Sequence, residues 1–336
     1  MIFQQIDFHN VEQMIPWENG YLMARLPETV FQRVNQGIRE RSGFYSTGIE
    51  LRFRLNSDSV DLWLRAMPEL EAQVAYLFYG SIQGGWQMSS YVIGTEPTRL
   101  HLQKPDNLET LKRITEKERL PFSPEVIRLV LPYGNCIFLK AEGDMEPPRP
   151  GDTPADCYLA YGSSITHGSL ALAAPYTYPF RIAQKMKCDY LNLGFAGTAQ
   201  MEPAMAEYIV SRKDWSFASV EMGVNMLGES FSEKGFEQNI DRFTAILAKD
   251  PRPVFATSIF GFPGDQKRAD QFRAIVKKYA ESRLLFVDGL ELLNQDAYIS
   301  QDGVHPTLEG MEKIADRWFN MMNNHFSNKD RQWSKR

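Results

Sequence analysis

Residues 157–168 read CYLAYGSSITHG, a short apolar run that ends in glycine and leads at once into two serines. A run of this length that ends at a glycine is typical of a buried strand in a parallel sheet. Similar runs lie at 190–194, 217–223, 253–260 and 284–289. Parallel α/β sheets bind ligands at the carboxyl ends of their strands, and Ser163 and Ser164 stand at one such end.

Helical patterns separate these apolar runs. Apolar side chains recur every three or four positions over 236–247 and 269–279, and most regularly over 311–322. Strands that alternate with helices predict an α/β domain built on a parallel sheet.

The first 145 residues follow a different period. GIELRFRL (48–55) and SVDLWLRA (59–66) alternate apolar with polar residues, which predicts strands with one buried face and one charged face. Further strands are expected at 74–80, 89–94, 126–132 and 135–143. Many short strands separated by turn-forming residues predict an all-β sandwich.

The two patterns meet at EPPRPGDTP (146–154), whose prolines disfavour both a helix and a central strand. This stretch predicts a stiff connector. We therefore expect a β-sandwich domain over residues 1–150 and an α/β domain over residues 151–336.

Composition narrows the class of protein. A net charge of −5 argues against a nucleic-acid surface, and no window approaches the 18 consecutive apolar residues of a membrane span. Cys136, Cys157 and Cys188 are too few and too widely spaced for a disulfide framework or a zinc site. The start MIFQQIDFHN lacks the pattern of a signal peptide. We expect a reduced, cytoplasmic, soluble protein with no nucleic-acid or membrane partner; the sequence indicates no oligomeric state.

Ser163 or Ser164 can act as a nucleophile only if a base reaches its hydroxyl, because a serine hydroxyl alone is a poor nucleophile. Of five histidines, His305 stands in DGVHPT, three residues after Asp302, where the carboxylate can reach back to the imidazole. His167 competes, since it lies beside the serines. Two plain interpretations stay open: Ser164 as a turn serine, and Asp302 as a cap of the following helix.

The chain order of these residues resembles the GDSL or SGNH hydrolase superfamily, whose fold is a flavodoxin-like three-layer α/β/α sandwich. Gly162-Ser163-Ser164-Ile165-Thr166 is similar to its first block and implies Ser164 as the nucleophile. Asp302-Gly303-Val304-His305 is similar to its last block and implies a triad of Ser164, Asp302 and His305. The pattern Gly-x-Ser-x-Gly of the α/β-hydrolases does not occur at 162–166.

Two further blocks resemble the oxyanion hole of the same superfamily. NLGFAG (192–197) matches Gly197 to the family's glycine, and GVNM (223–226) matches Asn225 to its asparagine. The resemblance implies that the amides of Ser164 and Gly197 and the side chain of Asn225 stabilise the oxyanion. Met226 stands where the family usually has aspartate. The plainer interpretation is a turn glycine followed by an asparagine in a turn.

The β-rich half is similar to the jelly-roll-like domains that precede the catalytic domain in certain carbohydrate esterases and in a group linked to polyketide acyl tailoring. The resemblance implies a serine esterase for short-chain, acetyl-type esters of carbohydrate-like or other small substrates, with no metal or organic cofactor. An acyltransferase with the same acyl-enzyme and a non-catalytic glycan-binding protein stay open as alternatives. The aromatic residues that could stack on a sugar are Trp63, Tyr76, Tyr79 and Trp86.

Overall fold

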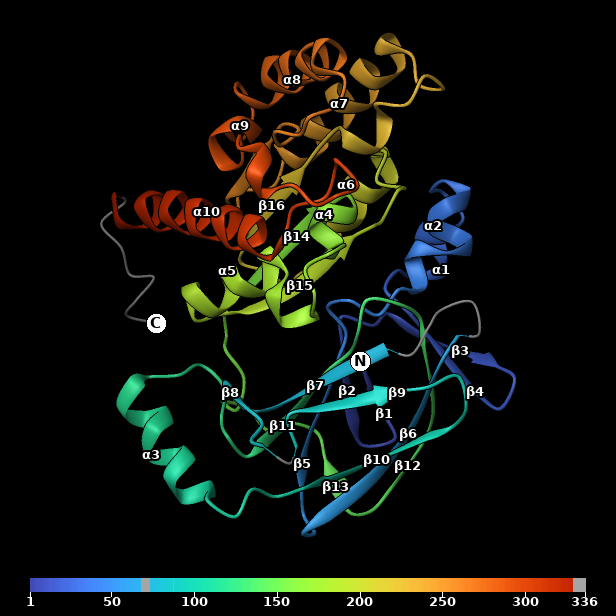
Figure 1. Ribbon diagram of the computed structural model, residues 1–336, viewed down its shortest axis with the longest axis vertical. Coiled ribbons are helices and arrows are strands. Elements are labelled where there is room, and N and C mark those ends of the chain that lie inside the picture. Colours follow the sequence, from blue (N-terminus) through green and yellow to red (C-terminus); the bar gives the residue numbers. More distant parts are fainter. Residues whose placement is uncertain (68–72, 87, 329–336) are drawn as a thin grey trace.

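The computed structural model describes residues 1–67, 73–86 and 88–328. Figure 1 shows a β-rich half at the bottom and a half with helices around a sheet at the top. Within the described residues, the antiparallel strands lie between positions 2 and 146 and the parallel strands between 157 and 287, so the predicted change of architecture at mid-chain is confirmed.

The β-rich half contains two antiparallel sheets that share one core. One consists of β1 (Ile2–Phe3), β2 (Ile6–His9), β5 (Glu50–Leu55), β7 (Gln73–Tyr79), β8 (Ile82–Gln83), β9 (Ser90–Ile93), β11 (Val126–Val130) and β13 (Met145–Glu146). The other consists of β3 (Gln13–Trp17), β4 (Gly20–Ala24), β6 (Ser59–Ala66), β10 (Thr98–Gln103) and β12 (Cys136–Glu142). The strand orders are β1-β2-β5-β11-β7-β8, with β13 beside β5 and β9 beside β7, and β10-β6-β12-β4-β3. The expected sandwich is therefore present.

Both faces of β5 are buried, which the sequence pattern did not show. Leu51 and Phe53 face the sandwich core, as expected. The opposite face carries Glu50 and Arg52, which are also buried, because it covers the C-terminal half of the chain. The predicted apolar face and charged face of β5 are both present, and both are buried, because period-2 alternation distinguishes two faces without saying what covers each.

Helices interrupt the β-rich half, which the all-β interpretation did not include. They are α1 (Glu28–Phe31), α2 (Gln36–Glu40), the 3-10 turn η1 (Ser42–Phe44) and α3 (Leu108–Glu118). Val30, Phe31 and Ile38 leave the sandwich and join the core of the C-terminal half. Figure 1 shows α1 and α2 rising from the sandwich beside the upper half.

The C-terminal half is a five-stranded parallel sheet. Its strands are β14 (Cys157–Gly162), β15 (Asp189–Gly194), β16 (Phe217–Glu221), β17 (Val254–Thr257) and β18 (Leu285–Val287). Their order, β15-β14-β16-β17-β18, places the first strand between the second and the third, as in the flavodoxin-like doubly wound fold.

Helices cover both faces of this sheet. They are α4 (Ser164–His167), α5 (Tyr178–Met186), α6 (Pro203–Ser211), α7 (Glu233–Leu247), α8 (Gln266–Ala280), α9 (Gly289–Leu292) and α10 (Leu308–Asn328), with 3-10 turns η2 (Ala174–Tyr176), η3 (Val224–Met226) and η4 (Asp296–Tyr298). Leu159 and Tyr161 of β14 pack in the core shared with α6, α7 and α8. Tyr158 and Ala160 pack in the core shared with α5 and α10. The predicted three-layer α/β/α arrangement is confirmed.

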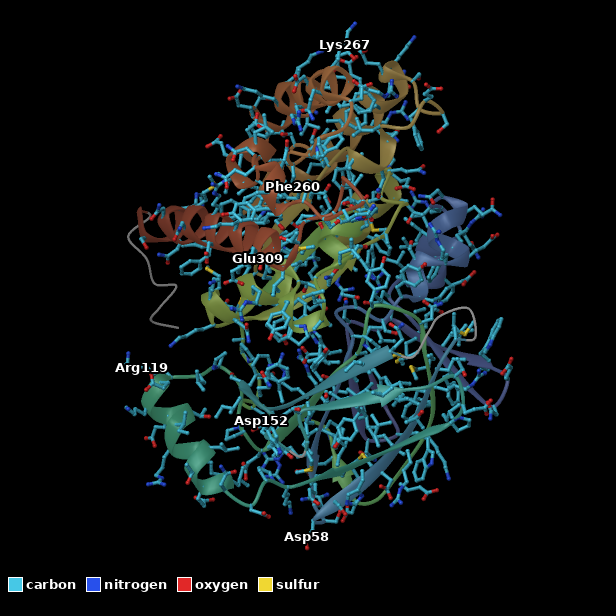
Figure 2. All side chains as sticks on the ribbon, viewed as in Figure 1. Asp58, Arg119, Asp152, Phe260, Lys267 and Glu309 are labelled. Carbon is cyan, nitrogen blue, oxygen red and sulfur yellow. The ribbon has the colours of Figure 1, made fainter. Side chains whose placement is uncertain are left out.

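A buried ion-pair network joins the two halves. The Arg52 guanidinium donates to both carboxylate oxygens of Asp189, at 2.6 and 2.7 Å, and to Glu50 at 2.8 Å. Arg128 completes the network with two hydrogen bonds to Glu50, each 2.7 Å long. Side chains fill the region between the halves in Figure 2. The proposed boundary near residue 150 stays a prediction, because residues on both sides of it share buried contacts.

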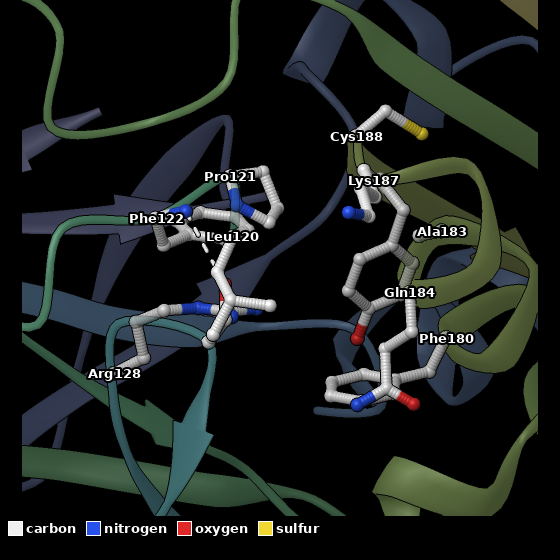
Figure 3. Close-up of a pocket in the computed structure, with 11 residues that line it drawn as sticks. Leu120, Pro121, Phe122, Arg128, Phe180, Ala183, Gln184, Lys187 and Cys188 are labelled. Atoms are coloured by element: carbon white, nitrogen blue, oxygen red, sulfur yellow. Dashed lines mark hydrogen bonds between the residues drawn. The ribbon is translucent and has the colours of Figure 1, made fainter. Parts of the chain in front are cut away.

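A cavity of about 140 Å³ also lies between the halves (Figure 3). Leu120, Phe122 and Arg128 line it from the β-rich half, and Phe180 and Cys188 line it from the other. Burial raises the pKa of the Cys188 thiol well above its usual value, so this thiol is not poised as a nucleophile. The cavity contains none of the predicted site residues.

Candidate active site

The two adjacent serines have different tasks in the structure. Ser163 is the N-cap of α4, and its hydroxyl accepts a 3.1 Å hydrogen bond from the amide of Ile165. Ser164 is the first residue of the helix and lies at the carboxyl end of β14. Gly162 is required before them, because a Cβ there would lie 2.1 Å from the Thr166 hydroxyl oxygen.

Ser164, His305 and Asp302 form a connected triad. The Ser164 hydroxyl lies 2.8 Å from His305 Nε2, and His305 Nδ1 lies 2.5 Å from Asp302 Oδ2. Because an ionised carboxylate only accepts, Nδ1 carries the hydrogen and Nε2 is free to accept from the serine. The sequence prediction that a histidine 141 positions away reaches Ser164 matches this geometry.

Asp302 is held by more than the imidazole. Its Oδ1 accepts hydrogen bonds from the Ser300 hydroxyl at 2.7 Å and from the amides of Val304 and His305 at 2.9 and 3.0 Å. Burial alone would raise the pKa of Asp302, but the hydrogen bonds from His305, Val304 and Ser300 outweigh it and lower that pKa well below its usual value. Asp302 does not cap α10, which begins six residues later at Leu308.

His167, the competing base, is turned away from the nucleophile. Its two ring nitrogens each lie 3.2 Å from a backbone carbonyl, of Gly194 and of Tyr133. The side chain is fully buried, and burial, together with the charge of Arg25, lowers its pKa to about 3. A neutral imidazole carries one N–H, so His167 donates to one of these two carbonyls, and its ring lies between β15 and the β-rich half.

The three predicted oxyanion donors share a common property. Within residues 1–67, 73–86 and 88–328, the amide N–H groups of Ser164 and Gly197 and the side-chain NH2 of Asn225 donate to no protein acceptor. The Asn225 carbonyl oxygen accepts from the amide of Ala199 at 3.0 Å, which leaves the nitrogen end as the available donor. Met226, where the family usually has aspartate, is instead buried in the core.

The oxyanion blocks lie next to the nucleophile because their strands are neighbours. Gly194 pairs with Gly162, and the amide of Phe195 donates to the Gly162 carbonyl at 2.8 Å. Gly197 follows three residues after Gly194 and has φ +72°, a conformation that favours glycine. Its role as an oxyanion donor stays a prediction.

Sequence reasoning missed a buried support beneath the nucleophile. Glu221 ends β16, is 2% exposed, and accepts from the amide of Ser163 at 2.7 Å and the hydroxyl of Thr166 at 3.2 Å. Burial raises its pKa. Asn192 donates to the Thr166 carbonyl at 2.9 Å. An acidic residue that ends the apolar run FASVE was the available signal for Glu221.

No group of three or more His, Cys, Asp and Glu side chains among the described residues is arranged to hold a metal ion. Of the helices in the part of the chain that the structure describes, none combines the length and apolar character that crossing a membrane requires.

Comparisons with known proteins match both halves. Residues 160–313 match the GDSL-like lipase/acylhydrolase family. A salicylyl-acyltransferase from a tetracycline biosynthetic pathway superposes with a TM-score of 0.76 at 16% identity, covering 96% of this chain and 95% of that chain. No curated protein matches the sequence.

Two carbohydrate esterases of family two have the same arrangement of halves. The enzyme from Cellvibrio japonicus gives a TM-score of 0.59 at 11% identity and covers 87% of this chain and 92% of its own. The enzyme from Clostridium thermocellum, in complex with cellohexaose, gives 0.55 at 14% identity and covers 83% and 92%. At these identities the likeness establishes the fold.

Proposed function

We propose that the protein is a serine esterase, from the premise that residues 160–313 match the GDSL-like lipase/acylhydrolase family. The proposed substrates are short-chain, acetyl-type esters of carbohydrate-like or other small alcohols, hydrolysed through an acyl-enzyme. The single observation that carries this proposal is the position of His305, between the Ser164 hydroxyl and the Asp302 carboxylate.

The proposed reaction has two half-reactions. Ser164 Oγ attacks the ester carbonyl while His305 Nε2 takes the hydroxyl proton, and Asp302 stabilises the imidazolium that forms. The amides of Ser164 and Gly197 and the side chain of Asn225 stabilise the developing oxyanion. His305 returns its proton to the leaving alcohol, which departs. Water, deprotonated by His305, then attacks the acyl-enzyme and releases the acid and Ser164.

The likeness to two carbohydrate esterases supports the proposed substrate class, because it extends over the β-rich half as well as the catalytic one. Glycan recognition without catalysis has less support. The ring of Tyr79 is buried and its hydroxyl donates to the Gln103 carbonyl, while Lys140 covers the ring of Trp63 at 4.3 Å. Of the aromatic residues named as candidates for stacking on a sugar, Trp86 is the one whose side chain is fully exposed.

Acyl transfer is the second candidate function, favoured by the likeness to the salicylyl-acyltransferase over 96% of this chain. Both functions share the acyl-enzyme and differ in whether water or an alcohol attacks it. Adding acceptor alcohols to the assay and analysing the products by mass spectrometry separates them. A transferred acyl group that outweighs free acid supports transfer.

The test of the proposal compares p-nitrophenyl acetate, butyrate and octanoate as substrates of the wild type, Ser164→Ala and Ser163→Ala. We expect wild-type turnover of the acetate and butyrate, and a kcat/KM for Ser164→Ala that is lower by about 1,000-fold or more. Ser163→Ala loses a helix cap and the contact of the hydroxyl with Glu221, but no group of the triad, so it should stay within about tenfold of the wild type and melt at a lower temperature. Undiminished activity of Ser164→Ala contradicts the proposal.

A further inference from the structure

Arg41 reaches from the β-rich half to the loop that carries the predicted oxyanion glycine. Its side chain lies after α2 and is exposed. One guanidinium nitrogen, Nη2, donates a long 3.4 Å hydrogen bond to the carbonyl of Ala196. A Cβ placed on Gly197 would lie 3.2 Å from the same nitrogen. The guanidinium therefore occupies the side of Gly197 where other residues have a side chain.

A second arginine lies behind this loop and has no carboxylate partner in the described part of the chain. Arg25 is fully buried, and it donates to the carbonyls of Asn192 at 3.0 Å and Ser42 at 2.5 Å. Its Nε has no partner there, and its guanidinium lies 4.8 Å from the centre of the Phe195 ring. Burial lowers its pKa to about 9, so the group still carries its charge at neutral pH.

The positive charge at this place is not neutralised within residues 1–67, 73–86 and 88–328. Neither Arg25 nor Arg41 forms an ion pair there. Glu40 and Glu202 lie on neighbouring elements and accept hydrogen bonds from the neutral amides of Gln36 and Asn35. Neither forms an ion pair with Arg25 or Arg41 in the described part of the chain. A buried charge without a counter-ion is costly, which makes this one an exception that needs a reason.

The charges of the same two arginines also act on Tyr133. Burial raises the pKa of Tyr133, and the charges of Arg41 and Arg25 oppose that rise. The carbonyl of Tyr133 contacts His167 of the nucleophile helix, and its hydroxyl lies 2.9 Å from that of Ser169, two residues after the helix. The charges of Arg41 and Arg25 therefore reach a residue that also contacts α4.

We propose that Arg41 binds a carboxylate of the ester substrate beside the scissile carbonyl, with Arg25 supplying additional positive field from behind. The inference rests on the proposed esterase function, because it places the carboxylate relative to the carbonyl that Ser164 attacks. A planar guanidinium with four N–H groups not engaged by Ala196 matches a carboxylate bidentately. Arg41 is thus a specificity-determining residue that the β-rich half contributes.

The test uses two pairs of esters that differ only by a methyl group on a carboxylate. In one pair, 4-acetoxybenzoate and its methyl ester, the charge is on the leaving alcohol. In the other pair, 4-nitrophenyl hydrogen succinate and its methyl ester, the charge is on the acyl group. The variants are Arg41→Gln, which removes the charge, Arg41→Lys, which keeps it, and Arg39→Gln. Arg39 is an exposed arginine on α2 and serves as the matched control.

We expect Arg41→Gln to lower kcat/KM for the charged member of one pair about tenfold and to leave its methyl ester within about twofold. Arg41→Lys should recover part of the loss, and Arg39→Gln should behave as the wild type. Which pair responds shows on which side of the ester the carboxylate lies. An equal loss on charged and neutral esters, or an unchanged ratio, overturns the proposal.

Binding measured without turnover separates this inference from the esterase proposal. In the Ser164→Ala background, calorimetry with the charged esters should show an affinity that falls about tenfold when Arg41→Gln is added. If that difference is present but the wild type hydrolyses none of the esters, the esterase proposal fails and the carboxylate site stands. If the esters are hydrolysed but neither measurement depends on Arg41, the carboxylate site fails and the esterase proposal stands.

Discussion

Two of the histidine and aspartate pairs in this protein, His305 with Asp302 and His9 with Asp189, have opposite surroundings. At the candidate active site, His305 Nδ1 lies 2.5 Å from Asp302, and its Nε2 faces the Ser164 hydroxyl. At the junction of the two halves, His9 Nε2 lies 2.6 Å from the Tyr190 carbonyl and 3.5 Å from Asp189 Oδ1. The residue types are the same, yet the two imidazoles can do different chemistry.

The difference lies in what else each carboxylate binds. Asp189 is neutralised by the Arg52 guanidinium, and burial together with the charge of Arg52 lowers the pKa of His9. Asp302 accepts only from neutral amides, a hydroxyl and the His305 ring, so its negative charge remains available to an imidazolium. A carboxylate already neutralised by an arginine fixes structure, whereas one held by neutral donors can support proton transfer.

The largest effect is expected from Asp302→Asn. This change keeps the shape of the side chain but removes the charge that stabilises the imidazolium and selects the tautomer, so kcat should fall about 10,000-fold. The urea midpoint should change little, because the Asp302 side chain is 38% exposed. Kinetics on p-nitrophenyl acetate and a urea titration measure the two quantities. Loss of stability with retained activity would make this pair structural, like the other.

Asp189→Asn should do the reverse: it should lower the free energy of unfolding and leave kcat nearly unchanged. It leaves the buried Arg52 with Glu50 as its remaining partner, which is also engaged by Arg128, and should destabilise the fold by about 3–5 kcal/mol. Urea denaturation measures this loss, and kcat of the folded variant should stay within about twofold. Glu207→Gln, which breaks the exposed pair with Arg33, is the control and should cost under about 1 kcal/mol. If Asp189→Asn does not lower the free energy of unfolding, the junction between the two halves does not depend on this charge.

The smallest of the three effects is the expected loss of folding stability at acidic pH. Burial would raise the pKa of Glu50, but Arg128 and Arg52 lower it to about 2 from 4.5. A lowered carboxylate pKa stabilises the fold above the unfolded value, and that stability is lost as the pH falls from 4.5 towards 2. The loss amounts to about 3 kcal/mol. Urea titrations of the wild type and Glu50→Gln at pH 7, 4 and 3 measure this loss. Glu50→Gln should start less stable and give the flatter curve, because its side chain no longer titrates. An equally steep curve for Glu50→Gln would assign the acid sensitivity to other carboxylates.

Much of the fold could be predicted because its signals are local. The apolar runs that end at Gly162 and Gly194 specify parallel strands, and strand neighbours then bring their carboxyl ends together. The order of Ser164, Asp302 and His305 along the chain was enough to select them. Their proximity was a product of topology, since α10 and the loop before it return to the end of β14.

What escaped prediction depends on the other half of the chain. Arg25 and Arg41 belong to no motif, and only the folded structure places them against Asn192 and Ala196. The helices α1 and α2 have four and five residues, too few to show a helical period. For α3, with eleven residues, an amphipathic signal is present over 108–118, but the strands on either side of it favour an all-β interpretation.

The apolar segment that includes Val30, Phe31 and Ile38 imposes an order of events on the newly made chain. Its partners in the C-terminal core, such as Leu193 and Tyr208, are more than 150 positions downstream. At about 5–20 residues per second, a ribosome takes on the order of ten seconds to make that stretch. During this interval the segment is exposed on a nascent sandwich, where chaperones can reach it. Proteolysis of ribosome-arrested chains should cut there until residue 210 has emerged, and protection before that point would contradict this order.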